Sequence, residues 1–583
     1  MKYRVLTILT ILGWLTAAAK VPASAQTFTN LATFSGSSGP GQSGANPEAG
    51  LVQGTDGNFY GTTYDDGGYS YGTVFRVTPT GTVKAIYSFC SQPNCTDGSY
   101  PEAGLILGTD GNFYGTTGSG GANGFGTAFK INSGGSLTRL YSFCAQTQCA
   151  DGANPQAGLI QATDGNYYGT TFGGGMNGSG TVFKMTSEGA LTTLYSFCMG
   201  TNCADGAYPS AVLVEGTDGN LYGTTVTGGL GTSNNPNGTI FKITTSGTFT
   251  SLYSFCMQSN CPDGDAPAGL VQATNGNFYG ATYYGGANCP AWGGCGTVFE
   301  LSPQPITGCA TGSTAGNGWC ETVLYSFCSQ ANCSDGAFPS AGLIQATDAN
   351  FYGTTEGGFN ADEYSFYGTI FQITLAGNLT TLHSFDVSDG EYPMGVLLQA
   401  TNGSFYGTTN GGDNPGTIFS LSMGLPPFAQ TVNTAAKIGT KVTVLGNNLT
   451  GASAVSFNET AASFTVPKST EIKATVPAGA TTGPVSVTMP SSTLSTPVSF
   501  GVLPAIKTVE PKKGPVGTVV TITGSGLTQT SAITFGGVSA NNFTVDSDTE
   551  VTATVPTGAV TGNISITTLG GVATSKATFT VTQ

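Results

Sequence analysis

The chain has 583 residues, of which 39% are hydrophobic and only 8% are charged, and its formal net charge is −15. Such an acidic surface repels phosphate backbones and anionic membranes, which excludes nucleic acid as a partner. A single histidine, His383, excludes metal sites built from several imidazoles and argues against a Ser-His-Asp triad.

The first 25 residues have the composition of a secretory signal peptide. Lys2 and Arg4 precede an apolar run over residues 5–19, and Ala23-Ser24-Ala25 offers the small residues of a cleavage site. The run is shorter than the ~20 residues that cross a bilayer, and no later stretch reaches that length. We therefore expect a cleaved leader at residues 1–25, an extracellular or cell-surface location, and no membrane span in the mature chain.

Residues 26–424 are dominated by a repeat whose centre reads Asn-Phe-Tyr-Gly-Thr-Thr. Successive copies lie 54, 54, 54, 57, 73 and 54 residues apart. A period of this length with several short strands is typical of the blades of a β-propeller. The central glycines of the copies are Gly61, Gly115, Gly169, Gly223, Gly280, Gly353 and Gly407.

Each copy is predicted to contain four strands, because apolar, aromatic and β-branched residues alternate with a period of two. Asp56-Gly57 is a hairpin turn between the first two strands of the first copy. The expected strands of that copy are residues 50–55, 58–63, 73–78 and 82–89.

The seventh copy stops after its third strand, at residues 418–421. Residues 28–34 (Phe-Thr-Asn-Leu-Ala-Thr-Phe) resemble the fourth strand of the other copies. An N-terminal strand that pairs with the last copy would remove the open sheet edges. We therefore predict an all-β fold that begins with a seven-bladed β-propeller over residues 26–424, closed by its N-terminal strand.

All 14 cysteines lie in this repeat region. Their even number, their regular spacing and the export signal predict disulfides. Zinc is the alternative for thiolate pairs, but each pair belongs to a different repeat, and a tetrahedral site needs four ligands together. The expected pairs are Cys90–Cys95, Cys144–Cys149, Cys198–Cys203, Cys256–Cys261, Cys289–Cys295, Cys309–Cys320 and Cys328–Cys333.

The rest of the chain contains a second repeat. Residues 471–477 (Glu-Ile-Lys-Ala-Thr-Val-Pro) recur in similar form at residues 550–556. The segments around them consist of short alternating strands, which are typical of small β-sandwiches. We expect two immunoglobulin-like modules, at residues 425–503 and 504–583.

Both repeats resemble known families. The 54-residue unit resembles the GloVer-type tandem repeat of exported bacterial proteins over residues 27–421, most clearly at residues 162–171 (Ala-Thr-Asp-Gly-Asn-Tyr-Tyr-Gly-Thr-Thr). The tail modules resemble IPT/TIG immunoglobulin-like domains, most clearly at residues 519–527 and 532–537. The first resemblance implies export and a propeller-like repeat without an established activity. The second implies a spacer or an interaction platform.

One end of the predicted propeller carries short turns, and the other carries long loops with the regular disulfides. Binding residues are expected on the long loops, because a rigid scaffold holds them. Aromatic rings beside carboxylates suit sugars, whose C–H faces stack on the rings; packing of these rings against neighbouring blades is the alternative. The candidate ligand-binding residues are Tyr64, Asp66, Tyr69, Tyr283, Tyr284, Trp292, Glu356, Phe359, Asp362 and Glu363.

Two further polar sets recur in the copies. An Asp-Gly pair follows each regular disulfide, and recurs in the copy without these cysteines. The aspartate carboxylates of this set are able to bind Ca²⁺. Asp-Gly is also a standard turn pair, and we favour the interpretation that these aspartates close turns. A second set shares one register in the first strands and suits a polar lining of a central channel. The aspartates are Asp97, Asp151, Asp205, Asp263, Asp335 and Asp389, and the second set is Gln53, Gln161, Glu215, Gln272, Gln345 and Gln399.

The sequence contains no Gly-x-Ser-x-Gly elbow, phosphate-binding loop or dinucleotide fingerprint. We therefore expect no cofactor, and a non-catalytic protein that binds an extracellular polysaccharide or another cell-surface component, with the tail as a spacer. A polysaccharide hydrolase or lyase is the first alternative, because such chemistry needs only two loop carboxylates. A purely structural surface or matrix protein is the second.

Overall fold

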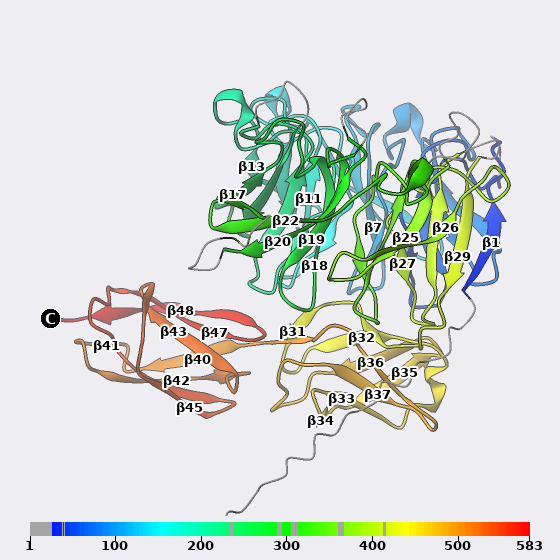
Figure 1. The fold of residues 1–583 in the computed structure, drawn as a ribbon. Helices are drawn as coiled ribbons and strands as arrows, with labels where there is room; N and C mark the ends of the chain where they lie inside the picture. The colour runs from blue at the N-terminus through cyan, green and yellow to red at the C-terminus, as the bar shows by residue number, and fades with distance from the viewer. Residues whose placement is uncertain are drawn as a thin grey trace, which may run out of the picture.

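The computed structural model describes residues 26–37, 39, 41–231, 237–288, 294–304, 309, 313–358, 367–411 and 415–583. This part of the chain is all-β, and short 3-10 turns are its only helical segments (Figure 1). No helix in it is long and apolar enough to cross a membrane. The expected signal peptide lies outside the described residues.

Residues 27–422 form seven antiparallel sheets, which we number as repeat sheets 1 to 7 in the order of the copies. Sheets 1 to 4 contain β2 (Val52–Gln53), β3 (Phe59–Thr63), β4 (Thr73–Val77) and β5 (Val83–Ser88); β6 (Ile106–Leu107), β7 (Phe113–Thr117), β8 (Thr127–Ile131) and β9 (Leu137–Ser142); β10 (Ile160–Gln161), β11 (Tyr167–Thr171), β12 (Thr181–Met185) and β13 (Leu191–Ser196); and β14 (Val214–Glu215), β15 (Leu221–Thr225), β16 (Thr239–Ile243) and β17 (Phe249–Ser254).

Sheet 5 has an additional hairpin strand, and sheet 7 takes its outer strand from the N-terminus. Sheets 5 to 7 contain β18 (Asp265–Gln272), β19 (Phe278–Tyr284), β20 (Thr297–Pro303), β22 (Trp319–Ser326) and β21 (Ser313–Gly316); β23 (Ile344–Gln345), β24 (Phe351–Thr355), β25 (Thr369–Ile373) and β26 (Leu379–Ser384); and β27 (Leu398–Gln399), β28 (Phe405–Thr409), β29 (Thr417–Ser422) and β1 (Thr27–Thr33).

The first strand of most copies is shorter than the sequence predicts. In the first copy β2 covers two residues instead of the expected residues 50–55. Before β2, Gly50 lies so close to sheet 7 that an added Cβ would be 2.3 Å from the carbonyl oxygen of Val396. After β2, the N–H of Gly54 donates to the carbonyl of Asn58 across the turn (2.8 Å). The other three expected strands of this copy are observed to within one residue at each end.

The central glycine of each copy is the point of closest packing inside its sheet. In sheet 2 an added Cβ on Gly115 would lie 2.8 Å from both Leu105 Cδ2 and Phe129 Cζ. The phenylalanine of the third strand therefore occupies the space that a side chain on the second strand would need. The same close approach to a phenylalanine ring is found at Gly61, Gly169, Gly223, Gly280, Gly353 and Gly407.

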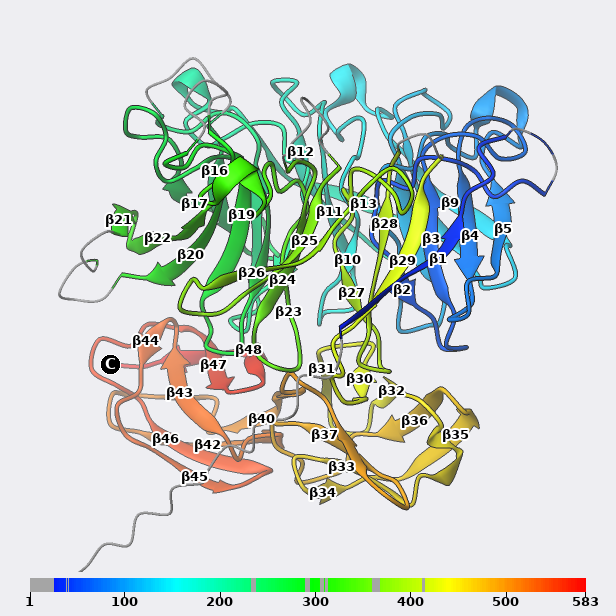
Figure 2. The ribbon, with the colours of Figure 1, turned by 45° about the vertical axis from the view of Figure 1, so that its right-hand side comes forward.

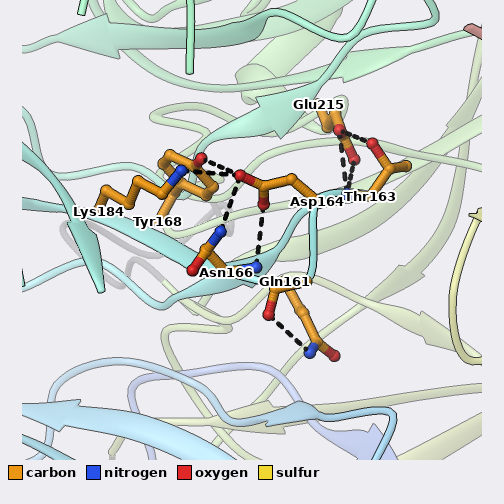
Figure 3. Close-up of polar contacts among 8 residues, drawn as sticks. Gln161, Thr163, Asp164, Asn166, Tyr168, Lys184 and Glu215 are labelled. Carbon is orange, nitrogen blue, oxygen red and sulfur yellow. Dashed lines mark hydrogen bonds and ion pairs between the residues drawn. The ribbon is translucent and has the colours of Figure 1, made fainter. Parts of the chain in front are cut away.

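Hairpin turns that follow the first strands are held by an aspartate, as Figure 3 shows for sheet 3. Asp164 Oδ1 accepts the N–H of Asn166 (2.9 Å), and Asp164 Oδ2 accepts bonds from the Tyr168 hydroxyl (2.7 Å) and Lys184 Nζ (2.9 Å). Burial alone would raise the pKa of Asp164, but these bonds hold it below its ordinary value. The predicted Asp-Gly-Asn turn is confirmed. Equivalent bonds surround Asp56, Asp110, Asp218 and Asp348.

Side chains at the end of the first strands link neighbouring sheets. The N–H of Thr163 in sheet 3 donates to the carboxylate of Glu215 in sheet 4 (3.0 Å). The N–H of Thr401 in sheet 7 donates to Gln53 Oε1 in sheet 1 (3.0 Å). Sheet 2 carries Leu107 at this position and supplies no such bond. The remaining links are Thr109–Gln161, Thr217–Gln272, Thr274–Gln345 and Thr347–Gln399.

The N-terminal strand forms the outer edge of sheet 7. β1 pairs antiparallel with β29, in a register that runs from Thr27 opposite Ser422 to Thr33 opposite Thr417. This is the edge at which the seventh copy lacks a strand of its own. Phe28 of β1 stacks on the ring of His383 in sheet 6, with 3.7 Å between the ring centroids.

Two β-sandwich modules follow the repeat sheets. The first contains β30 (Gln430–Thr431), β31 (Ala435–Lys437), β32 (Lys441–Leu445), β33 (Ala454–Phe457), β34 (Thr460–Ala461), β35 (Phe464–Lys468), β36 (Glu471–Thr475), β37 (Val485–Thr488), β38 (Thr493–Ser495) and β39 (Gly501–Leu503). The second contains β40 (Ala505–Glu510), β41 (Lys513–Gly514), β42 (Val519–Ser525), β43 (Thr530–Phe535), β44 (Val538–Ser539), β45 (Phe543–Ser547), β46 (Glu550–Thr554), β47 (Gly562–Thr568) and β48 (Gly571–Val581).

The two modules lie beneath the end of the repeat sheets that carries the hairpin turns, which we call the turn end (Figures 1 and 2). In the first module, Lys468 Nζ donates to Thr55 Oγ1 of sheet 1 and Thr470 Oγ1 donates to the Thr55 carbonyl, both at 2.7 Å. Asn447 Nδ2 donates to Thr401 Oγ1 of sheet 7 (3.1 Å). The opposite end of the sheets, which carries the long loops, is the loop end.

Substitution Gly115→Ala tests the central packing. The new methyl group must displace Leu105 or Phe129, so we expect a loss of about 1–3 kcal/mol in the free energy of unfolding. Urea denaturation followed by circular dichroism measures it. Gly200→Ala is the control, because its nearest added contact lies at 4.0 Å and its backbone suits alanine. Equal stability of both variants would contradict the packing argument.

Candidate functional site

Disulfides fix the loops that lead from one sheet into the next at the loop end. No cysteine in the described part of the chain is free, and the expected partner of Cys295, Cys289, lies outside it. Four of the loops contain a 3-10 turn: η1 (Pro93–Cys95), η2 (Thr147–Cys149), η3 (Thr201–Cys203) and η5 (Ala331–Cys333). The confirmed pairs are Cys90–Cys95, Cys144–Cys149, Cys198–Cys203, Cys256–Cys261, Cys309–Cys320 and Cys328–Cys333.

The aspartates after the regular disulfides close these loops, as their Asp-Gly sequence indicates. Asp97 Oδ2 accepts hydrogen bonds from the Tyr87 hydroxyl (2.7 Å) and the N–H of Ser91 (3.0 Å). In the copy without these cysteines, His383 Nε2 takes the place of the tyrosine hydroxyl, 2.7 Å from Asp389 Oδ2. The turn interpretation is therefore confirmed for this set. The other members are Asp151, Asp205, Asp263 and Asp335.

Pairs of aromatic rings bridge neighbouring sheets at the loop end. In each pair one ring lies at or directly after the end of the second strand of a sheet, and the other directly precedes the proline that enters the next sheet. The ring centroids of Phe172 and Tyr208 are 4.9 Å apart, and the rings are stacked. Tyr64 and Tyr100 lie at 5.0 Å, and Tyr283 and Phe338 at 5.4 Å.

The ring before each proline is held in a left-handed backbone conformation, which is uncommon for a bulky residue. Tyr208 has a φ of 57°. Two backbone hydrogen bonds keep it there: its N–H donates to Ser179 of the previous sheet (2.9 Å), and its carbonyl accepts the N–H of Val226 in its own sheet (3.2 Å). An equivalent backbone hydrogen bond to the previous sheet joins the N–H of Asn46 in sheet 1 to the carbonyl of Pro415 in sheet 7 (2.8 Å). The backbone of the residue before the proline is thus fixed, and its ring packs against the ring of the neighbouring sheet.

Three half-buried glutamates from different sheets accompany these rings. Burial, followed by the charges of Glu102, Asp65 and Glu356, raises the pKa of Glu48 from 4.5 to about 7. Burial also raises the pKa of Glu102 and of Glu356. Because Glu48 responds to the charges of carboxylates from sheets 2 and 6, the three belong to one electrostatic cluster. Asn410 of sheet 7 lies beside Glu48, with Nδ2 3.5 Å from Oε1.

We call this set the loop-end ring. It joins the aromatic pairs to the glutamate cluster through one direct contact, in which the Tyr283 hydroxyl donates to Glu356 Oε2 (2.8 Å). Two tyrosines that precede prolines are partly exposed: Tyr208 of the pair above at 36%, and Tyr392 at 39%. The members of the loop-end ring are Glu48, Tyr64, Tyr100, Glu102, Phe172, Tyr208, Tyr283, Phe338, Glu356, Tyr392 and Asn410.

The structure brings together only some of the site residues proposed from the sequence. Tyr64, Tyr283 and Glu356 belong to the loop-end ring, and Tyr284 lies edge-on to Tyr283 at 4.7 Å. Tyr69 is 53% exposed, and Asp66 lies beside it in a left-handed turn. Asp66 and Tyr69 belong to the loop after β3 and are not members of the loop-end ring. The other four, Trp292, Phe359, Asp362 and Glu363, lie outside the described residues.

Sequence reasoning missed Glu48 and Glu102 because it concentrated on the loops between second and third strands. The signal is present: Pro-Glu-Ala-Gly occurs at residues 47–50 and again at 101–104, directly before the first strand. The same position holds Gln156 in the third copy. An alignment of the copies therefore reveals a variable position beside an invariant proline, with Ala268 and Met394 in the fifth and seventh copies.

Substitution Glu48→Gln tests the electrostatic cluster. A carboxyl group whose pKa is higher in the folded than in the unfolded chain contributes stability at low pH, and this contribution disappears as the pH rises through the interval between the two values. The wild type should therefore lose stability relative to Glu48→Gln between about pH 4.5 and pH 7. Thermal unfolding at several pH values measures the difference. The exposed tail variant Glu459→Gln is the control, and parallel pH profiles for wild type and Glu48→Gln would contradict the cluster.

Three solved structures resemble the chain weakly. A fungal alcohol oxidase of the AA5 family in complex with copper shares 12% identity at a TM-score of 0.45, over 82% of this chain and 98% of that one. The surface protein SGBP-B from a xyloglucan utilization locus of Bacteroides uniformis shares 26% at 0.14, over 26% and 48% of the two chains. The surface glycan-binding protein PbSGBP-B from Prevotella bryantii shares 18% at 0.21, over 25% and 38%. At these scores the likenesses carry no argument about activity.

Family comparisons are decisive for the identity of the repeats. No curated protein matches the chain. The IPT/TIG domain family matches residues 427–502 and 504–581, so the tail consists of two such domains. The Gloeobacter/Verrucomicrobia repeat family matches residues 17–231, 145–310 and 230–452, which together cover most of the chain. The protein therefore belongs to the Gloeobacter/Verrucomicrobia repeat family.

Proposed function

We propose that the seven repeat sheets are the blades of a closed β-propeller, which comprises residues 26–424. The contacts between sheets 7 and 1 support closure: β1 completes sheet 7, and Thr401 bonds to Gln53. We further propose that residues 1–25 are a cleaved export signal and that the immunoglobulin-like domains occupy residues 425–503 and 504–583.

The protein is proposed to act outside the cell or at its surface as a non-catalytic binding protein for a polysaccharide or a similar extracellular polymer. Six disulfides within the described residues support an oxidising environment. The observation that carries the binding proposal is the loop-end ring, which contains three aromatic pairs and three glutamates. Sugars use both kinds of group, since their C–H faces stack on rings while their hydroxyl groups bind carboxylates and amides.

The charge of the propeller narrows the choice of polymer. Residues 26–424 contain 26 acidic and 6 basic side chains, and the loop-end ring itself carries three carboxylates. A polyanion would be repelled at this end. The proposed ligand is therefore a neutral or cationic polymer.

A polysaccharide hydrolase is the second candidate, and one observation favours it. The pKa of Glu48, about 7, suits a general acid near neutral pH, and Glu356 belongs to the same cluster. Two carboxyl groups of this kind are the minimum that glycoside hydrolysis requires. The non-catalytic proposal is preferred because the residues that distinguish the loop-end ring are aromatic rings rather than a matched acid and base.

Binding is tested with the full chain and a panel of immobilised neutral, amino-substituted and acidic polysaccharides. Retention is expected on at least one neutral or cationic polymer, without release of reducing ends. Because each stacked ring contributes roughly 0.5–1.5 kcal/mol, Tyr208→Ala and Tyr392→Ala should each weaken retention about 2- to 10-fold. The tail variant Leu569→Ala, which removes an exposed apolar side chain far from the ring in sequence, is the control.

The other outcomes decide between the alternatives. Release of reducing ends that disappears in Glu356→Gln, while retention persists, would establish the hydrolase instead. Absence of retention on every polymer would exclude the binding proposal and leave a structural role.

A further inference from the structure

The links between neighbouring repeat sheets at the turn end are incomplete in one place. Six threonine N–H groups donate to a glutamine or glutamate of the next sheet. The seventh threonine, Thr55 of sheet 1, faces sheet 2, where Leu107 stands at the position of the glutamine. The side chain of leucine has no oxygen atom to accept the bond. Sheet 1 is therefore joined at its turn end to sheet 7 but not to sheet 2 by a link of this type.

The first tail module contacts this threonine. Lys468 Nζ donates to Thr55 Oγ1, and Thr470 Oγ1 donates to the Thr55 carbonyl, both at 2.7 Å. The methyl group of Thr470 also covers the turn, since an added Cβ on Gly57 would lie 2.8 Å from Thr470 Cγ2. The module thus supplies polar contacts at the one position where the neighbouring sheet supplies none.

The same module contacts the junction on the other side of sheet 1. Thr401 Oγ1 accepts bonds from Gln53 Nε2 (3.2 Å) and from Asn447 Nδ2 of the module (3.1 Å), and its carbonyl accepts the N–H of Phe428 (3.0 Å). Thr401 is completely buried, whereas its five counterparts that make the same link, Thr109, Thr163, Thr217, Thr274 and Thr347, are exposed or half-buried. The tail therefore shields only this link from water.

The first tail module packs less closely against sheets 2 and 3. A cavity of about 210 Å³ separates the module from the turns of sheets 2 and 3, with Thr109 and Gln161 on one side and Asn433 and Lys437 on the other. The direct polar contacts of the module with the described repeat sheets are thus concentrated on sheets 1 and 7, and sheet 7 contains both the first and the last strand of the repeat region.

We infer that the first immunoglobulin-like domain is an intramolecular clamp that holds sheet 1 in place, replacing its missing link to sheet 2 and covering its link to sheet 7. Its role goes beyond that of a spacer. The inference is independent of any ligand at the loop end, since every contact that carries it lies at the turn end.

The test uses hydrogen exchange, measured by mass spectrometry on the full chain. The double variant Lys468→Met and Thr470→Val removes both polar contacts with sheet 1. It also removes the ion pair between Lys468 and Glu471 (3.3 Å), but Glu471 keeps its second partner, Lys473 (3.0 Å). We expect the hairpin of residues 52–60 to exchange about 30-fold faster, because two hydrogen bonds of roughly 1 kcal/mol each are lost and each 1.4 kcal/mol corresponds to a factor of ten. The hairpin of residues 214–222 in sheet 4, which keeps its own links, should exchange at the wild-type rate.

A rescue variant separates the clamp from a general loss of stability. Leu107→Gln introduces the missing link to Thr55, so in the double variant it should restore exchange of residues 52–60 to within about twofold of the wild type. The matched control, Lys576→Met and Thr544→Val, makes the same chemical changes in the second tail module and should have no effect. The inference is overturned if the double variant leaves residues 52–60 unchanged, or if Leu107→Gln fails to slow their exchange.

Discussion

The contact on which the structure depends is the approach of a phenylalanine ring to the central glycine of each copy. Because a side chain on this glycine would overlap the phenylalanine ring, only glycine leaves room for the ring on this face of the sheet. The same contact recurs in all seven sheets. Differences between the copies are thereby confined to the two ends, where loops and turns leave the packed region.

The turn end and the loop end of the repeat sheets differ in the contacts that they make. At the turn end, glutamine and glutamate side chains of one sheet accept hydrogen bonds from threonine N–H groups of the preceding sheet. The first tail module covers part of this surface. At the loop end, disulfides and aspartates hold the connecting segments, so that the residue before each proline is forced into a strained left-handed conformation. A rigid support of this kind is what a binding surface needs, because side chains that are already ordered lose little entropy when a ligand arrives.

Most of the strands, turns and disulfides could be predicted because they are local: alternation, Asp-Gly pairs and the Cys-x4-Cys spacing are visible within one copy. The glutamate cluster could not, since Glu48, Glu102 and Glu356 come from sheets 1, 2 and 6, and only the arrangement of the sheets brings them within reach of one another's charge. The contact between the first tail module and sheet 1 could not be predicted from the sequence either. Lys468 and Thr55 are 413 residues apart, and nothing in either local sequence indicates the contact.

The pairing of β1 with β29 places the first strand of the repeat region beside the last. Almost 400 residues separate the partners, so this contact carries a large loop-closure entropy and cannot form until the whole repeat region has been synthesised. Until the two strands pair, the edges of β1, and the outer edge of β29 once it has been made, remain open for pairing with other chains. The N-terminal strand is therefore synthesised first but paired last. The rate at which β1 pairs with β29 decides how long these open edges can cause aggregation.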